Sequence, residues 1–355
     1  MKPSVFSVLG VMSGTSLDGV DFVLARFTYS TQWSFQIHGT ETIPYPTRWI
    51  EKLNSAVSLA PKELAQLDEE YTLYLGNLIT DYLAKNRAFT VDIVSSHGHT
   101  VKHNPAAGLT YQIGNLPLLS KQCNQTVVCD FRVADVALGG QGAPLVPGGE
   151  VHLFSDFAAC VNLGGFANIT HLISTPVFAY DIGAVNTILN YLMNKLGKAF
   201  DYNGELARSG KPIPSFLEAL NQLDFYTKKG PKSLGIEWVH LYLLPVLKEF
   251  DTHSIPDLLH SYCLHIGQQI GKELPKKGKV LFTGGGTHNL FLMELIRKHT
   301  SCDITVPEQE LIDFKEALVF AFLGVLKTLD QPNCLSSVTG AINNHSSGNI
   351  FLPND

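Results

Sequence analysis

The pattern of hydrophobic and polar positions predicts a chain in which strands and helices alternate. Two pairs of strand-like runs each enclose a polar, glycine-containing turn, which is the pattern of a β-hairpin. These hairpins are predicted at residues 5–27 and 158–173. Short buried strands are predicted at 93–96, 126–129 and 279–283, and each leads into polar or glycine-rich residues.

Apolar residues at steps of three and four predict amphipathic helices between these strands. The longest run covers residues 61–88, where Pro61 suits a first helical turn. Further helices are predicted after Asp181 up to residue 196, at 289–299 and at 309–329. Two hairpins, each followed by helical sequence, suggest a duplicated α/β architecture, although no sequence repeat is legible.

The length of 355 residues exceeds the size at which one hydrophobic core usually stops growing, so two domains, or one large split domain, are expected. Residues 134–149 are rich in glycine and proline, which predicts a loop crossing between domains. We expect one domain to comprise residues 1–132 and 330–355, and the other residues 133–329.

Composition narrows the class of protein and partner. Hydrophobic residues make up 45% and charged residues 16%, as in ordinary globular proteins. A net charge of -6 with no run of Lys or Arg argues against nucleic acid and anionic membranes and favours a small-molecule partner. Six cysteines without a CxxC pair indicate scattered thiols in a reducing compartment. No stretch approaches the roughly 20 apolar residues of a membrane span, so we expect a soluble, cytoplasmic protein.

Three glycine turns could bind polyphosphate, because glycine lets backbone N–H groups approach an anion closely. They lie at residues 13–21, 162–168 and 283–289. None is a Walker A loop or a GxGxxG fingerprint, so P-loop and dinucleotide-binding folds are disfavoured. Taken alone, Asp18-Gly19 is more simply a hairpin turn.

The first turn also offers side-chain chemistry. The hydroxyls of Ser13, Thr15 and Ser16 could donate to phosphate, and Asp18 and Asp21 could hold Mg²⁺ through water.

Asp181 is the candidate catalytic carboxylate. It lies where the apolar run 177–180 ends and where Gly183 could turn the chain into a helix. The same residue could equally be the N-cap of that helix.

His97, His99 and His103 form an H-x-H-x3-H pattern, which supports a metal-dependent hydrolase as a rival hypothesis. Asn104-Pro105 breaks the segment and no acidic residue completes the ligand set, so substrate hydrogen bonding or packing is favoured. Arg132 could meet a carboxylate or phosphate of a substrate, or form a local salt bridge.

These motifs together resemble the anhydro-N-acetylmuramic acid kinases. The resemblance rests on residues 10–21 (GVMSGTSLDGVD), 96–101 (SHGHTV), 112–114 (QIG), 130–132 (DFR), 139–147 (GGQGAPLVP), 162–168 (NLGGFAN) and 284–289 (GGGTHN). It implies an α/β fold of two actin-like (ribonuclease H-like) domains flanking an ATP cleft, and a homodimer.

The resemblance also implies site roles. Asp181 would be the catalytic base, and Asp18 and Asp21 would be Mg²⁺ ligands. Substrate would be bound by His97, Gln112, Arg132 and Asn186. ATP would be bound by Gly14, Thr15, Ser16, Leu17, Asp18, Gly19, Val20, Asp21, Gly164, Gly165, Asn168, Gly284, Gly285, Gly286 and Asn289.

The implied reaction opens the 1,6-anhydro ring of anhydro-N-acetylmuramic acid with water and phosphorylates O6, giving N-acetylmuramic acid 6-phosphate and ADP in cell-wall recycling. The chain departs from the family's usual pattern at Ala184-Val185, where Pro-Gly is expected, at Val133 in place of an arginine, and at His99 in place of Gln. A non-catalytic ATP- or sugar-binding sensor of the same fold is therefore a second hypothesis.

Overall fold

The computed structural model describes residues 4–14 and 17–354, and these form two compact units. The first unit comprises residues up to 153 and from 314 onward, and the second comprises residues 154–313. Residues 133–153 and 314–329, which we expected in the second domain, thus pack with the first unit. Among the described residues, no helix is both long enough and apolar enough to span a membrane.

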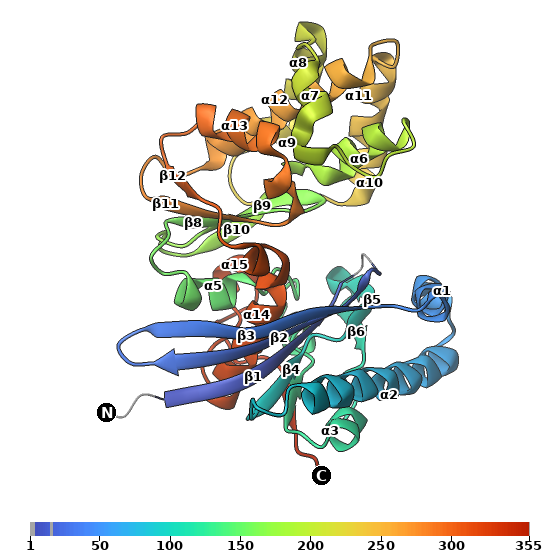
Figure 1. Ribbon diagram of the computed structural model, residues 1–355, viewed down its shortest axis with the longest axis vertical. Helices are drawn as coiled ribbons and strands as arrows, with labels where there is room; N and C mark the ends of the chain where they lie inside the picture. Colours follow the sequence, from blue (N-terminus) through green and yellow to red (C-terminus); the bar gives the residue numbers. More distant parts are fainter. Residues whose placement is uncertain (1–3, 15–16, 355) are drawn as a thin grey trace. The chain divides into compact units, whose positions relative to one another are not determined.

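The first unit is built on a six-stranded sheet with the strand order β13-β7-β4-β1-β2-β3 (Figure 1). Its strands are β1 (Ser4–Ser13), β2 (Gly19–Tyr29), β3 (Trp33–Pro44), β4 (Ile93–Ser96), β7 (Val127–Cys129) and β13 (Asn349–Phe351), and β5 (His99–Asn104) and β6 (Leu109–Ile113) form a separate pair. Its helices are α1 (Thr47–Ser55), α2 (Pro61–Lys85), α3 (Leu118–Cys123), α4 (Val133–Ala137), α5 (Pro147–Leu153), α14 (Gln309–Thr328) and α15 (Ser336–Thr339).

Helices cover both faces of this sheet. Successive side chains of a strand point to opposite faces, and the strands carry apolar side chains on both. Leu9 and Val11 of β1 belong to the core that includes α2. On the opposite face, Phe27 of β2 packs against Phe322 of α14 with ring centroids 5.2 Å apart. A side chain at Gly10 would lie 2.4 Å from the Ala317 carbonyl oxygen of α14, so glycine permits this close packing.

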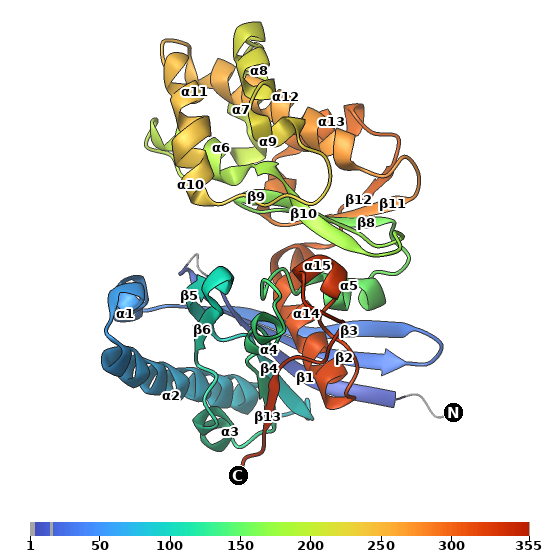
Figure 2. The ribbon, with the colours of Figure 1, turned by 180° about the vertical axis from the view of Figure 1, so that it is seen from behind.

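The second unit has a five-stranded sheet with the order β10-β9-β8-β11-β12 (Figure 2). Its strands are β8 (Ala159–Leu163), β9 (Phe166–His171), β10 (Phe178–Ala184), β11 (Lys279–Thr283) and β12 (Asp303–Thr305). Its longer helices are α6 (Asn186–Asn194), α8 (Pro214–Asn221), α11 (Leu244–Glu249), α12 (Ile255–Glu273) and α13 (Leu290–Lys298). Its shorter helices are α7 (Glu205–Ser209), α9 (Asp224–Thr227) and α10 (Ile236–Trp238).

The two sheets repeat one topology. In each, the first three strands form an antiparallel meander. The fourth strand pairs in parallel with the first, and the fifth pairs in parallel with the fourth. Strands β1, β2, β3, β4 and β7 thus correspond in order to β8, β9, β10, β11 and β12. This is the ribonuclease H-like strand order, so the predicted α/β class and the suspected duplication are confirmed.

Candidate functional site

The first glycine turn connects β1 to β2 in the first unit. The two strands pair up to Ser13 opposite Val20, and β2 begins at Gly19, which pairs with Pro44 of β3. Thr15 and Ser16 lie outside the described residues. Leu17 has a positive φ of 60°, and a side chain at Gly19 would lie 2.5 Å from the Ile43 carbonyl oxygen. The chain can therefore make this turn beside β3 only with glycine at position 19.

A buried polar network anchors the base of this hairpin. The hydroxyl of Ser13 lies 2.7 Å from the Tyr45 hydroxyl and 2.9 Å from Nδ1 of His99, and the Tyr45 hydroxyl lies 2.5 Å from that of Tyr71. Burial lowers the pKa of His99 to about 4, so its ring is neutral at pH 7. Ser13 thus holds the hairpin in place, which differs from the phosphate contact expected of it. No sequence motif contains Tyr45, so its part in this network could not be predicted.

Two carboxylates lie at the β2 end of the turn. The hydroxyl of Thr42 donates to Oδ1 of Asp21 over 2.6 Å, and the Asp18 carbonyl oxygen accepts a bond from the backbone N–H of Tyr45. The side chain of Asp18 is exposed to solvent. Carboxylate oxygens suit Mg²⁺ chemically, so both residues remain candidate ligands.

His97 and Arg132 are in direct contact in the first unit. Nδ1 of His97 lies 2.8 Å from the Gly98 carbonyl oxygen, and Nε of Arg132 donates to Nε2 of His97 over 2.8 Å. The ring is therefore neutral with its proton on Nδ1. Burial, helped by the Arg132 charge, holds the His97 pKa well below its usual value. Nη1 of Arg132 also donates to the Gly142 carbonyl oxygen, at 2.7 Å.

Gln112 lies on β6, opposite Thr100 of β5. Its Nε2 donates to the hydroxyl of Thr110 over 2.8 Å, and Nδ1 of His103 lies 3.1 Å from the same hydroxyl. Its Oε1 is buried without a hydrogen-bond partner. Such an atom is costly to leave unpaired, so it is a natural acceptor for a substrate hydroxyl or amide.

The histidine pattern does not form a metal centre. His97, His99 and His103 each use Nδ1 in a hydrogen bond to a different protein group. Within the described ranges, the one cluster of three potential metal ligands lies elsewhere and contains none of them. The geometry gives the metallohydrolase hypothesis no support.

In the second unit, the second and third glycine turns lie against each other. Strands β8 and β11 pair in parallel, with Asn162 opposite Thr283. A side chain at Gly286 would lie 2.8 Å from Cβ of Leu163, and one at Gly284, whose φ is 85°, would lie 2.6 Å from Oδ1 of Asn162. The glycines therefore let the two turns form one surface of backbone groups.

The start of α6 is tied to the same surface. The backbone N–H of Val185 donates to the Gly165 carbonyl oxygen over 2.7 Å, and Nδ2 of Asn186 donates to the Leu163 carbonyl oxygen over 3.3 Å. Asn289 caps α13, because its Oδ1 accepts a hydrogen bond from the Leu292 N–H at 2.9 Å. The amide of Asn289 therefore has a structural use beside any contact with nucleotide.

Asp181 lies within β10, so the expected position at a strand end and the alternative of a helix N-cap are both wrong. The strand continues to Ala184, and Val185 precedes α6. Gly183 is needed because a side chain there would lie 2.6 Å from Cδ1 of Ile266 in α12. Close packing, together with a register shift after Asp181, explains this glycine better than a turn.

The strand register aligns Asp181 with other polar residues. Asp181 pairs with Asn168 on β9, and Asn168 pairs with Asn162 on β8. Directly paired residues project from the same face of a sheet, so the three side chains form a polar row. Both asparagines are recognisable in the sequence as the ends of the turn at residues 162–168. Their alignment with Asp181 depends on strand pairing, which the sequence does not show.

The Asp181 carboxylate is held by the loop after α9. Its Oδ2 accepts the Leu234 N–H over 2.8 Å and the Ser233 hydroxyl over 3.4 Å. Burial raises the pKa of Asp181, and these two bonds, which favour the charged form, oppose that shift. A carboxylate with a raised pKa and one fixed oxygen is suited to accept a proton.

The departures from the family pattern lie in different environments. Ala184 and Val185 are fully buried in the core of the second unit. The Ala184 carbonyl oxygen also accepts a bond from the Tyr262 hydroxyl at 2.7 Å. Val133 begins α4 and is 43% exposed.

Comparison with known proteins identifies the family. The family model "Anhydro-N-acetylmuramic acid kinase" matches residues 6–353. The chain belongs to the anhydro-N-acetylmuramic acid kinase family. A curated family member from Pseudomonas syringae pv. tomato is 34% identical, covering 98% of this chain and 99% of its own. Another from Pasteurella multocida is also 34% identical, covering 99% of this chain and 98% of its own.

Proposed function

We propose that this protein is an ATP-dependent kinase that opens 1,6-anhydro-N-acetylmuramic acid with water and phosphorylates O6. The products are N-acetylmuramic acid 6-phosphate and ADP, and the physiological setting is peptidoglycan recycling. Full-length similarity to curated kinases of this name supports the substrate. The position of Asp181, a carboxylate with a raised pKa in a polar row beside a glycine turn, is the observation that carries the chemistry.

In the proposed reaction, Asp181 removes a proton from water as that water attacks C1 of the sugar. The C1–O6 bond breaks, and O6 attacks the γ-phosphorus of ATP as the bond to ADP breaks. The net reaction consumes one water and one ATP. The Leu234 N–H keeps Oδ2 oriented, so the base does not have to reorganise when the proton moves.

Residues of both units receive ligand-binding roles in this proposal. Backbone N–H groups of residues 14–21, Gly164–Gly165 and Gly284–Gly286 bind nucleotide, with Asn168 and Asn289 beside them. His97, Gln112, Arg132 and Asn186 bind the sugar. The unpartnered Oε1 of Gln112 accepts a sugar hydroxyl or the N-acetyl N–H, and Arg132 binds the lactyl carboxylate.

Mg²⁺ is the proposed metal partner of ATP. Asp18 and Asp21 fit it because both supply carboxylate oxygens on the phosphate hairpin. When bound, the metal neutralises phosphate charge during transfer.

We also propose a cytoplasmic homodimer. The cytoplasmic location agrees with the thiols: all six cysteines lie in the described residues and no disulfide joins them. The dimer follows the family resemblance, and light scattering of the purified protein tests it.

The direct assay measures ADP release with and without anhydro-N-acetylmuramic acid. The proposal predicts Mg²⁺-dependent release that the anhydro sugar stimulates strongly and N-acetylglucosamine does not. A folded protein that binds ATP but shows no stimulation would instead be the non-catalytic sensor.

A further inference from the structure

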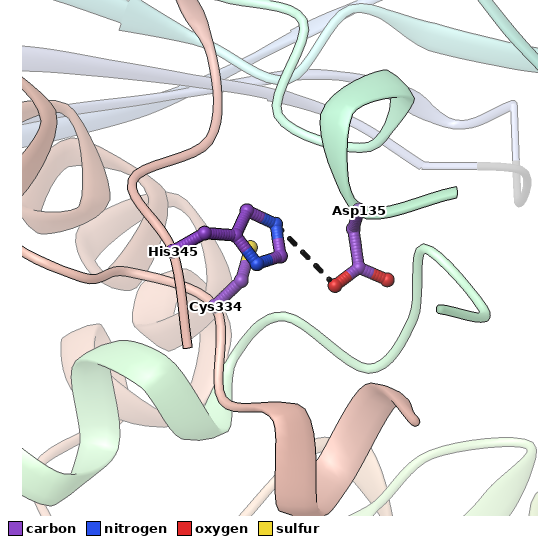
Figure 3. Close-up of side chains that lie close together, drawn as sticks. All are labelled: Asp135, Cys334 and His345. Carbon is purple, nitrogen blue, oxygen red and sulfur yellow. Dashed lines mark ion pairs between the residues drawn. The ribbon is translucent and has the colours of Figure 1, made fainter. Parts of the chain in front are cut away.

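A thiol, an imidazole and a carboxylate lie close together in the first unit, and none of the three belongs to a residue that was given a role above. They belong to Asp135, Cys334 and His345, and Figure 3 shows the three side chains converging. Their potential ligand atoms all lie within 4.8 Å of one another. Asp135 and Cys334 are buried, and the His345 side chain is 10% exposed.

The backbone holds two members of this cluster in register. Cys334 and His345 face each other across an isolated antiparallel bridge. Each backbone N–H donates to the other's carbonyl oxygen, over 3.1 Å and 3.2 Å. Opposed residues in such a bridge project to the same side, so the thiol and imidazole are paired by the chain itself.

Hydrogen bonds leave lone pairs pointing into the cluster. Nδ1 of His345 lies 3.1 Å from the Asn343 carbonyl oxygen, which places the proton on Nδ1 and leaves Nε2 as an acceptor. Nε2 is buried without a hydrogen-bond partner and lies 3.5 Å from Oδ1 of Asp135. In this tautomer Nε2 of His345 presents a lone pair toward Oδ1 of Asp135, and a cation bound between them would satisfy both atoms.

The surrounding bonds resemble the outer shell of a metal site. The hydroxyl of Thr339 donates to Oδ1 of Asp135 over 2.7 Å, and the Gly142 N–H donates to Oδ2 over 2.7 Å. Together with the Asn343 contact, these bonds fix the orientation of the carboxylate and the imidazole. Such second contacts orient ligands and tune affinity in metalloproteins.

We propose that Asp135, Cys334 and His345 bind one Zn²⁺, with water as a fourth ligand. A thiolate–imidazole–carboxylate set suits zinc and disfavours Mg²⁺ and Ca²⁺. Tetrahedral zinc with bonds of about 2.0–2.3 Å puts its ligand atoms about 3.3–3.7 Å apart, so the cluster needs to contract by at most about 1.5 Å.

The charges in the occupied site balance. The Cys334 thiol releases its proton on binding, and the resulting thiolate and the Asp135 carboxylate neutralise Zn²⁺, so the complex carries no net charge near the guanidinium of Arg132. The metal would join α4, which carries Asp135, to the C-terminal segment. Arg132 directly precedes α4, so zinc would also stiffen the segment that presents this substrate residue.

The test uses the full-length protein after removal of metals with a chelator. Co²⁺ alone should bind with one equivalent per chain and give the near-ultraviolet absorption of a thiolate–Co²⁺ bond. One equivalent of Zn²⁺ should remove that absorption and raise the melting temperature.

Variants assign the site. Cys334→Ser should abolish the thiolate absorption, and His345→Ala should weaken Zn²⁺ binding at least about 100-fold, beyond the loss typical of second-shell changes. Cys302→Ser, which changes the less buried thiol of Cys302, is the matched control and should leave the spectrum intact. Wild-type protein without stoichiometric Co²⁺ or Zn²⁺ binding, or an unchanged spectrum in Cys334→Ser, would overturn the proposal.

Discussion

The Asp181 carboxylate is subject to two opposing effects. Burial disfavours its charged form and raises its pKa, while the Leu234 N–H and the Ser233 hydroxyl favour the charge. The net effect is a carboxylate whose pKa is higher than that of an exposed aspartate, so it is the stronger base of the two. Because the two donors both contact Oδ2, the hydrogen bonds also define which oxygen is held.

Asp181→Asn tests the role of this base. An amide oxygen can still accept the Leu234 N–H but cannot take a proton from water, so kcat should fall by about 10²–10⁴-fold. The Kd for ATP, measured by calorimetry, should stay near wild type. Asp303→Asn, an exposed carboxylate on the edge strand of the same sheet, is the control and should leave kcat unchanged. Substantial turnover by Asp181→Asn would remove Asp181 from the mechanism.

The pH dependence provides an independent check. A base must be deprotonated to act, so kcat/KM should fall as pH decreases through the Asp181 pKa. Since that pKa is raised, the acid limb should lie above the value of about 3.9 for an ordinary aspartate. Ser233→Ala removes a bond that stabilises the charge, so it should move the limb to higher pH. A limb that moves to lower pH in this variant would contradict the assignment.

At the scale of elements, the second and third glycine turns act together because their backbones touch. Gly286 lies against Leu163, whereas a side chain at Gly285 would meet nothing within 4 Å. Alanine substitutions at these two neighbouring positions therefore distinguish the effect of crowding between the turns from the effect of losing a glycine.

Gly286→Ala should push the two turns apart. Overpacking of this kind costs about 1–3 kcal/mol, so the variant should have a lower melting temperature and a higher KM for ATP. Gly285→Ala should keep the wild-type melting temperature, because a side chain there meets no protein atom within 4 Å. Equal losses of melting temperature in the two variants would mean that contact between the turns does not stabilise this part of the unit.

The spacing of apolar residues predicted an element well wherever either strand alternation or helical spacing was clear. The hairpins, the helix at Pro61–Lys85 and the strand at Ile93–Ser96 are confirmed, because alternation and helical spacing are local properties. The environment of Asp181 could not be predicted, since its partners Asn168 and Leu234 come from distant positions. The prediction of a turn at Gly183 is wrong, because Gly183 lies in β10 and the residue that constrains it, Ile266, lies in the distant helix α12.

At the scale of the whole molecule, one strand order occurs twice in a chain without a legible sequence repeat. The correspondence pairs the turn after β4, which carries His97, with the turn after β11, which carries Gly284. Long-range packing also decides which unit each segment joins. Lys315 of α14, for example, donates to the buried Oε1 of Glu150 on α5 over 2.7 Å, both within the first unit. No local pattern at residues 133–153 or 314–329 indicates such contacts.

The whole-molecule claim is that one enzyme couples ring opening by water to phosphorylation of O6. Running the reaction in ¹⁸O-labelled water tests this claim most directly, with mass spectrometry of the product fragments as the measurement. The control is unlabelled N-acetylmuramic acid 6-phosphate kept under the same conditions, which measures exchange at C1. The account predicts one ¹⁸O at C1, above this control, and none in the phosphate. Product without label at C1, or with label in the phosphate, would contradict it.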